Sequence, residues 1–127
     1  MTEVTAHDAL TRLVAAAHDG TLDVLCDRLG VRVMGAFGSA VDPSASPNDL
    51  DLGVGFDATP PPLLALIDAL TVLLNFEHID VAVLDGANPV IRARAMCGVP
   101  LYERTPGRFA IEQMAALAEE RDTAWLR

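Results

Sequence analysis

Residues 49 to 56, "DLDLGVGF", constrain the fold more than any other stretch of this chain. Apolar and other residues alternate strictly, which predicts a β-strand whose two faces differ. One face carries two carboxylates and two glycines, and the other carries only large apolar side chains: Asp49, Asp51, Gly53 and Gly55 against Leu50, Leu52, Val54 and Phe56. The chain must therefore bury one face of this strand and find a use for two like charges on the other.

The rest of the chain alternates between helix-like and strand-like patterns. Further strands are expected at "VRVMGAF", "HIDVAVLD" and "VPLYER". Helices are expected from the Thr5 cap to Gly20, from there to Gly30, at 63–74, within "ANPVIRARAMCG", and from Arg108 to about Leu126. Helices on both sides of three or four short strands predict the α/β (α+β) class, with residues 1–127 forming a single domain around a small mixed sheet.

Two of these helices carry strong apolar faces. The helix at 63–74 is so apolar that the sheet should cover one side, with another chain as a candidate for the other. In the C-terminal helix, the apolar stripe contains Ile111, Met114, Leu117 or Ala118, and Trp125. Cys26 and Cys97 lie among apolar residues and are expected to be buried, reduced thiols.

Composition narrows the function classes. A hydrophobic content of 51% with 21% charged residues argues against disorder, and no apolar run approaches the ~20 residues of a membrane span. The first residues do not resemble a secretory signal, so a soluble cytoplasmic protein is expected. All nine basic residues are arginine, which excludes chemistry based on lysine. The net charge of −9 repels a phosphate backbone and makes a nucleic acid an unlikely partner.

The candidate site combines a turn with three carboxylates. Gly38 and Ser39 follow the first strand, Asp49 and Asp51 project from one face about 6 to 7 Å apart, and Asp80 lies in a later alternating strand. Two adjacent carboxylates repel unless a cation lies between them, and Mg²⁺ prefers such oxygen ligands together with substrate phosphates. The turn could offer N–H groups and a hydroxyl to phosphates. The alternative is that the aspartates form the solvent face of an edge strand.

This constellation resembles a known family. "GAFGSAVDPSASPNDLDLGV" is similar to the signature of the DNA polymerase β type nucleotidyltransferase superfamily, and above all to its minimal nucleotidyltransferases, usually encoded beside a HEPN-domain partner. On that resemblance Gly38 and Ser39 form the phosphate-binding turn. Asp49 and Asp51 are metal ligands, and Asp80 is the third carboxylate.

The resemblance implies a function. It implies Mg²⁺-dependent transfer of AMP from ATP onto a hydroxyl, that of a tyrosine of a HEPN toxin partner. The chain would then be the antitoxin of a type VII toxin–antitoxin pair, in a hetero-oligomer or homo-oligomer. Relatives often carry an arginine just after the turn, where this chain has Ala40 to Pro43. The alternative is therefore a catalytically inactive member that binds and neutralises its partner.

Three more residues are candidates for the site. Arg92 and Arg94 follow the third strand, and either could reach a triphosphate or lie on a solvated helix face. His78 could act as an acid or base near Asp80, or be a strand-end histidine with local contacts. Arg32 has no evident role, and Asp57 and Asp85 are expected to be solvated charges or caps.

Overall fold

The structure is a computed structural model that describes residues 3–124. Trp125 and Leu126, assigned above to the C-terminal helix, lie outside the described residues. In chain order the elements are α1 (Ala6–Asp19), α2 (Thr21–Arg28), β1 (Val31–Phe37), the short 3₁₀ turn η1 (Gly38–Val41), β2 (Leu50–Phe56), α3 (Leu63–Leu74), β3 (Ile79–Val83), α4 (Pro89–Met96), β4 (Val99–Glu103) and α5 (Arg108–Thr123). Each expected helix and strand is present.

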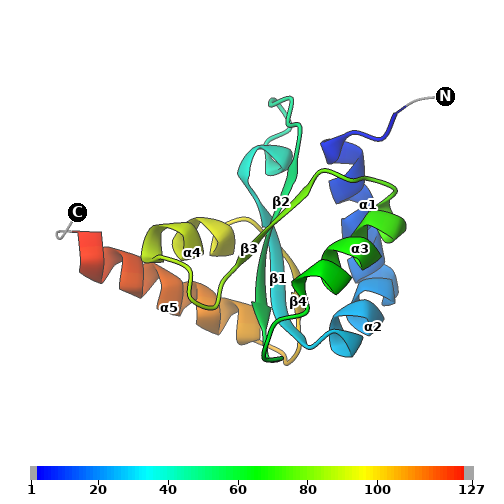
Figure 1. The fold of residues 1–127 in the computed structure, drawn as a ribbon. Coiled ribbons are helices and arrows are strands. Elements are labelled where there is room, and N and C mark those ends of the chain that lie inside the picture. The colour runs from blue at the N-terminus through cyan, green and yellow to red at the C-terminus, as the bar shows by residue number, and fades with distance from the viewer. Residues whose placement is uncertain (1–2, 125–127) are drawn as a thin grey trace.

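The four strands form one mixed sheet between two layers of helices. The strand order is β3-β2-β1-β4, in which β1 pairs antiparallel with both β2 and β4, and β2 pairs parallel with β3. Helices α1, α2 and α3 cover one face of the sheet, and α4 and α5 cover the other (Figure 1). This arrangement confirms the predicted fold class. Since β2 lies inside the sheet, the edge-strand interpretation of its aspartates is wrong.

Local signals set the helix ends. The Thr5 side chain accepts from the Asp8 backbone N–H at 3.1 Å and the Asp8 carboxylate accepts from the Thr5 N–H at 3.1 Å, so the expected capping box begins α1. Gly20 ends α1 in the left-handed region at φ 89°. Asn88 caps α4 by accepting from the Ile91 N–H, and Pro89 occupies the first helical position.

The main core lies between the sheet and α1 to α3. The apolar face of β2 is fully buried there, as its alternation predicts. The inward side of α3 also packs into this core, whereas Leu64 and Val72 on its outer side are 77% and 84% exposed. Buried side chains from four elements meet in this layer: Leu13, Leu22, Leu50, Leu52, Leu66 and Leu70. The described residues leave the outer side of α3 uncovered.

Small residues let the second helix layer approach the sheet. A Cβ on Gly53 would lie 2.7 Å from the Ala95 Cβ of α4, and a Cβ on Gly35 would lie 3.0 Å from the Phe109 ring of α5. A Cβ at Gly53 would force the helix to shift, and one at Gly35 would press on the Phe109 ring, so both positions favour glycine. Of the glycines that alternate with the aspartates in β2, Gly53 is therefore a packing position for α4, whereas Gly55 makes room for the Arg32 side chain of β1.

The apolar stripe named for α5 does not face the core. Ile111 and Met114 are 60% and 62% exposed, and Leu117 is also exposed. The helix instead turns Phe109 and Ala116 into the second core, with Glu112 and Gln113 on the same side. Glu112 meets an arginine and the Gln113 amide donates to the Met96 carbonyl, so polar contacts decide the orientation of the helix. Apolar periodicity alone does not show such partners.

The two cysteines differ. Cys26 is buried, and burial followed by the charge of Asp23 raises the pKa of its thiol to about 12, which keeps it protonated and inert. Cys97 is exposed, contrary to the expectation, because it follows the last residue of α4 and leaves the packed face. Among residues 3–124, no helix is both long and apolar enough to cross a bilayer.

Candidate functional site

The three predicted carboxylates come together at the start of β2 and β3. Asp51 and Asp80 are direct partners in the parallel register of these strands, so they project from the same face of the sheet. Asp49 lies in the bend one residue before β2 rather than within the strand. This face is the one that α4 covers further along β2, at Gly53. Two neighbouring strands thus present three acidic residues at one end of the sheet.

The Gly38-Ser39 turn lies against Asp51. Phe37, the last residue of β1, pairs with Asp51, and the chain then enters η1. Gly38 has a φ of 76°, and a Cβ there would lie 2.6 Å from the Asp51 Oδ2. The backbone conformation favours glycine at this position, and a Cβ would also displace the Asp51 carboxylate. Ser39 is exposed beside it, so the turn and the carboxylates form one site.

The electrostatics of the site are unbalanced. Partial burial raises the pKa of the Asp51 carboxyl, the negative charges of Asp80 and Asp49 raise it further, and Arg94 opposes the change. Both desolvation and repulsion by like charges therefore disfavour the ionised form of Asp51. A group in that state gains free energy when a cation binds beside it, which is the arrangement expected of a metal-binding carboxylate.

The residues present fit an open magnesium site better than a closed metal cage. Within residues 3–124, no three His, Cys, Asp or Glu side chains are already gathered around one point. Mg²⁺ usually keeps several waters and takes one or two carboxylates together with substrate phosphates. Asp49 and Asp51 supply such oxygen donors, and the adjacent turn offers the place for phosphates. Asp80 is within electrostatic reach as a third oxygen donor.

The loop between the turn and Asp49 is ordered by its own polar contacts. Asp42 accepts from the Ser44 N–H at 2.9 Å and from the Ser44 hydroxyl at 2.7 Å, and these bonds lower the pKa of its carboxyl. The ring of His7 in α1 lies 3.1 Å from the Asp42 carbonyl oxygen and ties the loop to the first helix. No basic residue occurs between Gly38 and Asp49. A basic side chain that contacts bound phosphates must therefore come from another part of the chain.

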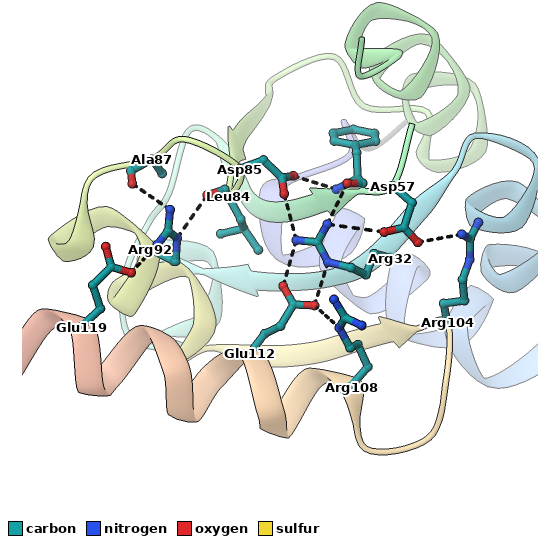
Figure 2. A network of polar contacts seen from close by, with 11 residues as sticks. Arg32, Asp57, Leu84, Asp85, Ala87, Arg92, Arg104, Arg108, Glu112 and Glu119 are labelled. Atoms are coloured by element: carbon teal, nitrogen blue, oxygen red, sulfur yellow. Dashed lines mark hydrogen bonds and ion pairs between the residues drawn. The ribbon is translucent and has the colours of Figure 1, made fainter. Parts of the chain in front are cut away.

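The structure separates the two arginines of α4. Arg92 donates to the carbonyls of Leu84 and Ala87 and forms an ion pair with Glu119, so it joins α4 to α5 and the β3 end (Figure 2). Arg94 is exposed, and its charge acts on Asp51. The expectation that either arginine could reach a triphosphate is therefore wrong for Arg92, whose guanidinium is already engaged.

His78 extends the row of side chains on β3. It precedes the strand, is exposed, and its ring packs edge-on against Phe76 with the centroids 5.7 Å apart. Its carbonyl accepts from the Leu50 N–H at 2.8 Å, which starts the pairing of β2 with β3. These contacts match the interpretation of His78 as a strand-end residue with local partners.

Sequence reasoning missed a second charged cluster, at the opposite end of the same strands. Arg32 donates to both carboxylate oxygens of Glu112 at 2.8 and 2.9 Å and to Asp85 at 3.0 Å, and it lies 3.7 Å from Asp57 (Figure 2). One extra residue in β1 between Val31 and Val33 turns Arg32 toward α5. Asp57 and Asp85 are thus structural partners rather than solvated charges. The polar break that Arg32 makes in an apolar strand was the available signal.

Comparison with known proteins yields the fold. No protein-family model matches the chain, and no curated protein matches its sequence. Solved structures do match. The MntA-HpeT toxin–antitoxin carrying two aspartate-to-glutamate substitutions two positions apart has a TM-score of 0.63 at 14% identity over 85% of this chain and 93% of that chain. A toxin–antitoxin with AMP-PNP has a TM-score of 0.64 at 16% identity over the same shares.

A third matching structure is a complex. It holds a tri-AMPylated HEPN toxin of Shewanella oneidensis with an MNT antitoxin, and it has a TM-score of 0.61 at 15% identity over 89% of this chain and 94% of that chain. At this identity the likeness establishes a shared fold, extending over almost the whole length of the matched chains. Function has to be argued from the site itself.

Proposed function

We propose that this chain is a minimal nucleotidyltransferase that transfers AMP from ATP to a tyrosine hydroxyl of a HEPN toxin and thereby acts as its antitoxin, in a type VII pair. One observation carries the proposal. Asp51 and Asp80 are register partners on parallel strands, and the Gly38-Ser39 turn, which is proposed to bind phosphate, lies directly against the Asp51 carboxylate. An ordinary edge strand needs neither feature.

The proposed roles follow from the positions. Asp49 and Asp51 would hold Mg²⁺, with Asp80 as the third carboxylate, and the ion would neutralise charge on the phosphates during displacement at phosphorus. The N–H groups of the turn and the Ser39 hydroxyl would donate to phosphate oxygens. The acceptor oxygen forms a bond to the α-phosphorus while the bond to the pyrophosphate oxygen breaks. The hydroxyl proton passes to Asp80, and pyrophosphate leaves.

The matched structures support the nucleotide and the partner. One contains AMP-PNP, a nucleotide of the size of ATP, and another contains a HEPN toxin that carries AMP groups. A third carries two aspartate substitutions with the spacing of Asp49 and Asp51. The net charge of −9 in this chain disfavours an RNA acceptor and agrees with a protein acceptor.

The test is a labelling experiment with two isotopically different nucleotides. The chain is incubated with Mg²⁺ and a purified HEPN-type protein as the candidate partner, using ATP labelled at the α-phosphate or at the γ-phosphate. Transfer of AMP puts the α label and none of the γ label on the partner, and mass spectrometry then locates it on tyrosine. Label from the γ position would indicate a kinase, and no label from either would contradict the proposed transfer.

A second function is favoured by a separate observation. The exposed apolar row Ile111, Met114 and Leu117 on α5 offers a surface for a protein, and the loop after Ser39 lacks a basic residue. These features suit a catalytically inactive chain that neutralises a partner by binding. In that case calorimetry would show partner binding without any binding of Mg²⁺ and ATP.

A further inference from the structure

Arg94 stands out among the arginines because of its surroundings. Most of the other described arginines have partners away from the carboxylates of the candidate site. Arg12 donates to the Leu74 carbonyl, Arg32 and Arg108 bind Glu112, Arg92 binds Glu119, and Arg104 binds Asp57. The side chain of Arg94 is exposed, and its charge is the basic one that acts on Asp51.

Packing fixes the last turn of α4 beside the candidate site. The next residue, Ala95, packs on Gly53, which lies two residues from Asp51 on the same face of β2. After the helix, a Cβ on Gly98 would fall 1.8 Å from the Ala36 carbonyl oxygen and 2.9 Å from the Phe37 Cα, immediately before the Gly38 turn. Contacts on both strands thus hold the end of α4 against the carboxylate and the turn together.

We propose that Arg94 binds the pyrophosphate portion of the nucleotide and supplies, from α4, the positive charge that the loop after Ser39 lacks. This inference rests on the proposed function. A guanidinium suits the role because its planar donors match phosphate oxygens and it is always charged. Glu120 lines the same shallow hollow as Arg94, and the charge of Arg94 also acts on Asp51 at the end of the sheet.

The competing interpretation is structural. Arg94 lies in the last turn of α4, where a positive charge favours the helix dipole, and its loss would then lower stability without any selectivity among ligands. The two interpretations differ in how the effect depends on the number of phosphates. A contact to the pyrophosphate portion affects a triphosphate strongly and a monophosphate weakly.

The experiment is calorimetry with Mg²⁺ and either AMP-PNP or AMP, using Arg94→Ala, Arg94→Lys and, as a control on the opposite helix layer, Arg28→Ala. Arg94→Ala should weaken AMP-PNP binding about 10- to 100-fold, as expected for hydrogen bonds between charged groups, and AMP binding less than about threefold. Arg94→Lys should fall between Arg94→Ala and the unchanged chain, and Arg28→Ala should match the unchanged chain.

The outcomes separate the inference from the function beneath it. Unchanged AMP-PNP binding by Arg94→Ala, or equal weakening of AMP and AMP-PNP, overturns the role of Arg94 while the unchanged chain still binds nucleotide. If the unchanged chain binds no AMP-PNP, the proposed function and the inference both fall. Magnesium binding without nucleotide gives a second readout, since removing a positive charge beside Asp51 should leave it equal or tighter.

Discussion

The strands β2 and β3 are flanked by carboxylates at both ends, and the two ends differ in how those charges are compensated. At the far end, Asp57 and Asp85 meet the guanidinium of Arg32, with Glu112 of α5 added (Figure 2). Hydrogen bonds that Arg32 donates to Glu112 and to Asp85 raise the pKa of Arg32, despite the opposing effect of burial. Burial alone would raise the pKa of Glu112, but its bonds to Arg32 and Arg108 lower it.

At the near end the compensation is missing. Burial and then the charges of Asp80 and Asp49 raise the pKa of Asp51, and Arg94 only partly offsets this effect. The far-end carboxylates thus form ion pairs with an arginine, whereas the near-end carboxylates, where the proposed chemistry occurs, have among the described residues only the charge of Arg94 nearby. We infer from this contrast that the near end is built for a cation supplied from outside the chain.

The largest expected effect removes the near-end charges. Asp49→Asn with Asp51→Asn should lower AMP transfer to the partner by at least about a thousandfold, because several kcal/mol of transition-state stabilisation depend on the metal ligands. Asp57→Asn, at the other end of β2, is the matched control and should keep most of the activity. Rates from the labelling assay decide, and similar losses in both variants would contradict the division between the two ends.

Breaking the far end should affect stability instead. The Arg32 side chain is only 12% exposed, and Arg32→Ala leaves Glu112 and Asp85 without their main partner. We expect a loss of about 3 to 5 kcal/mol in the free energy of unfolding, measured by urea denaturation. Arg104→Ala removes a more exposed pair with Asp57 and should cost less than about 1 kcal/mol. Equal costs would mean that Arg32 is not the centre of the cluster.

Magnesium should distinguish the two ends directly. At a concentration one hundred times its Kd, a ligand that binds only the folded chain adds about 2.7 kcal/mol to stability, visible as a rise in Tm. The double Asp49→Asn, Asp51→Asn variant should lose this rise, and Asp57→Asn should keep it. A Tm that rises equally in all three proteins would place the metal elsewhere.

The smallest effect concerns pH. A raised pKa in the folded state means that Asp51 favours folding only in its protonated form, and this contribution is lost as pH rises through the folded pKa. At neutral pH and without metal, Asp51→Asn should therefore stabilise the chain, by less than about 1 kcal/mol for a half-buried group. Urea denaturation in a chelating buffer measures the free energy of unfolding of this variant. A variant less stable than the unchanged chain would contradict the repulsion inferred at Asp51.

Glu112 should behave in the opposite way. Its lowered pKa provides stability that is present above its ordinary value of 4.5 and is lost as pH falls through the folded pKa. Glu112→Gln should therefore flatten the acid side of the stability profile, whereas Asp51→Asn should not. The same denaturation series, repeated toward low pH, compares the two variants.

The local pattern was sufficient for much of the fold. The alternation in 49–56 predicted a strand with one buried face, and the Thr5 box and Gly20 are short-range signals that marked helix ends where the structure has them. The aspartates and the Gly38 turn were also recognisable because each depends on residue types at fixed spacing. Such features are properties of neighbouring residues, and the sequence contains them directly.

Other features depend on partners that are distant in sequence. Glu112, eighty residues from Arg32, helps to turn α5 so that Ile111 and Met114 face outward, and the parallel register alone makes Asp51 and Asp80 neighbours. The different surroundings of Arg92 and Arg94 likewise depend on folding, which brings Glu119 to Arg92 and Asp51 within reach of the charge of Arg94. The sequence by itself determined which residue types were available and on which face of each strand they lay. Only the tertiary structure decided which charges were compensated, because ion pairs and register join segments that have no local signal in common.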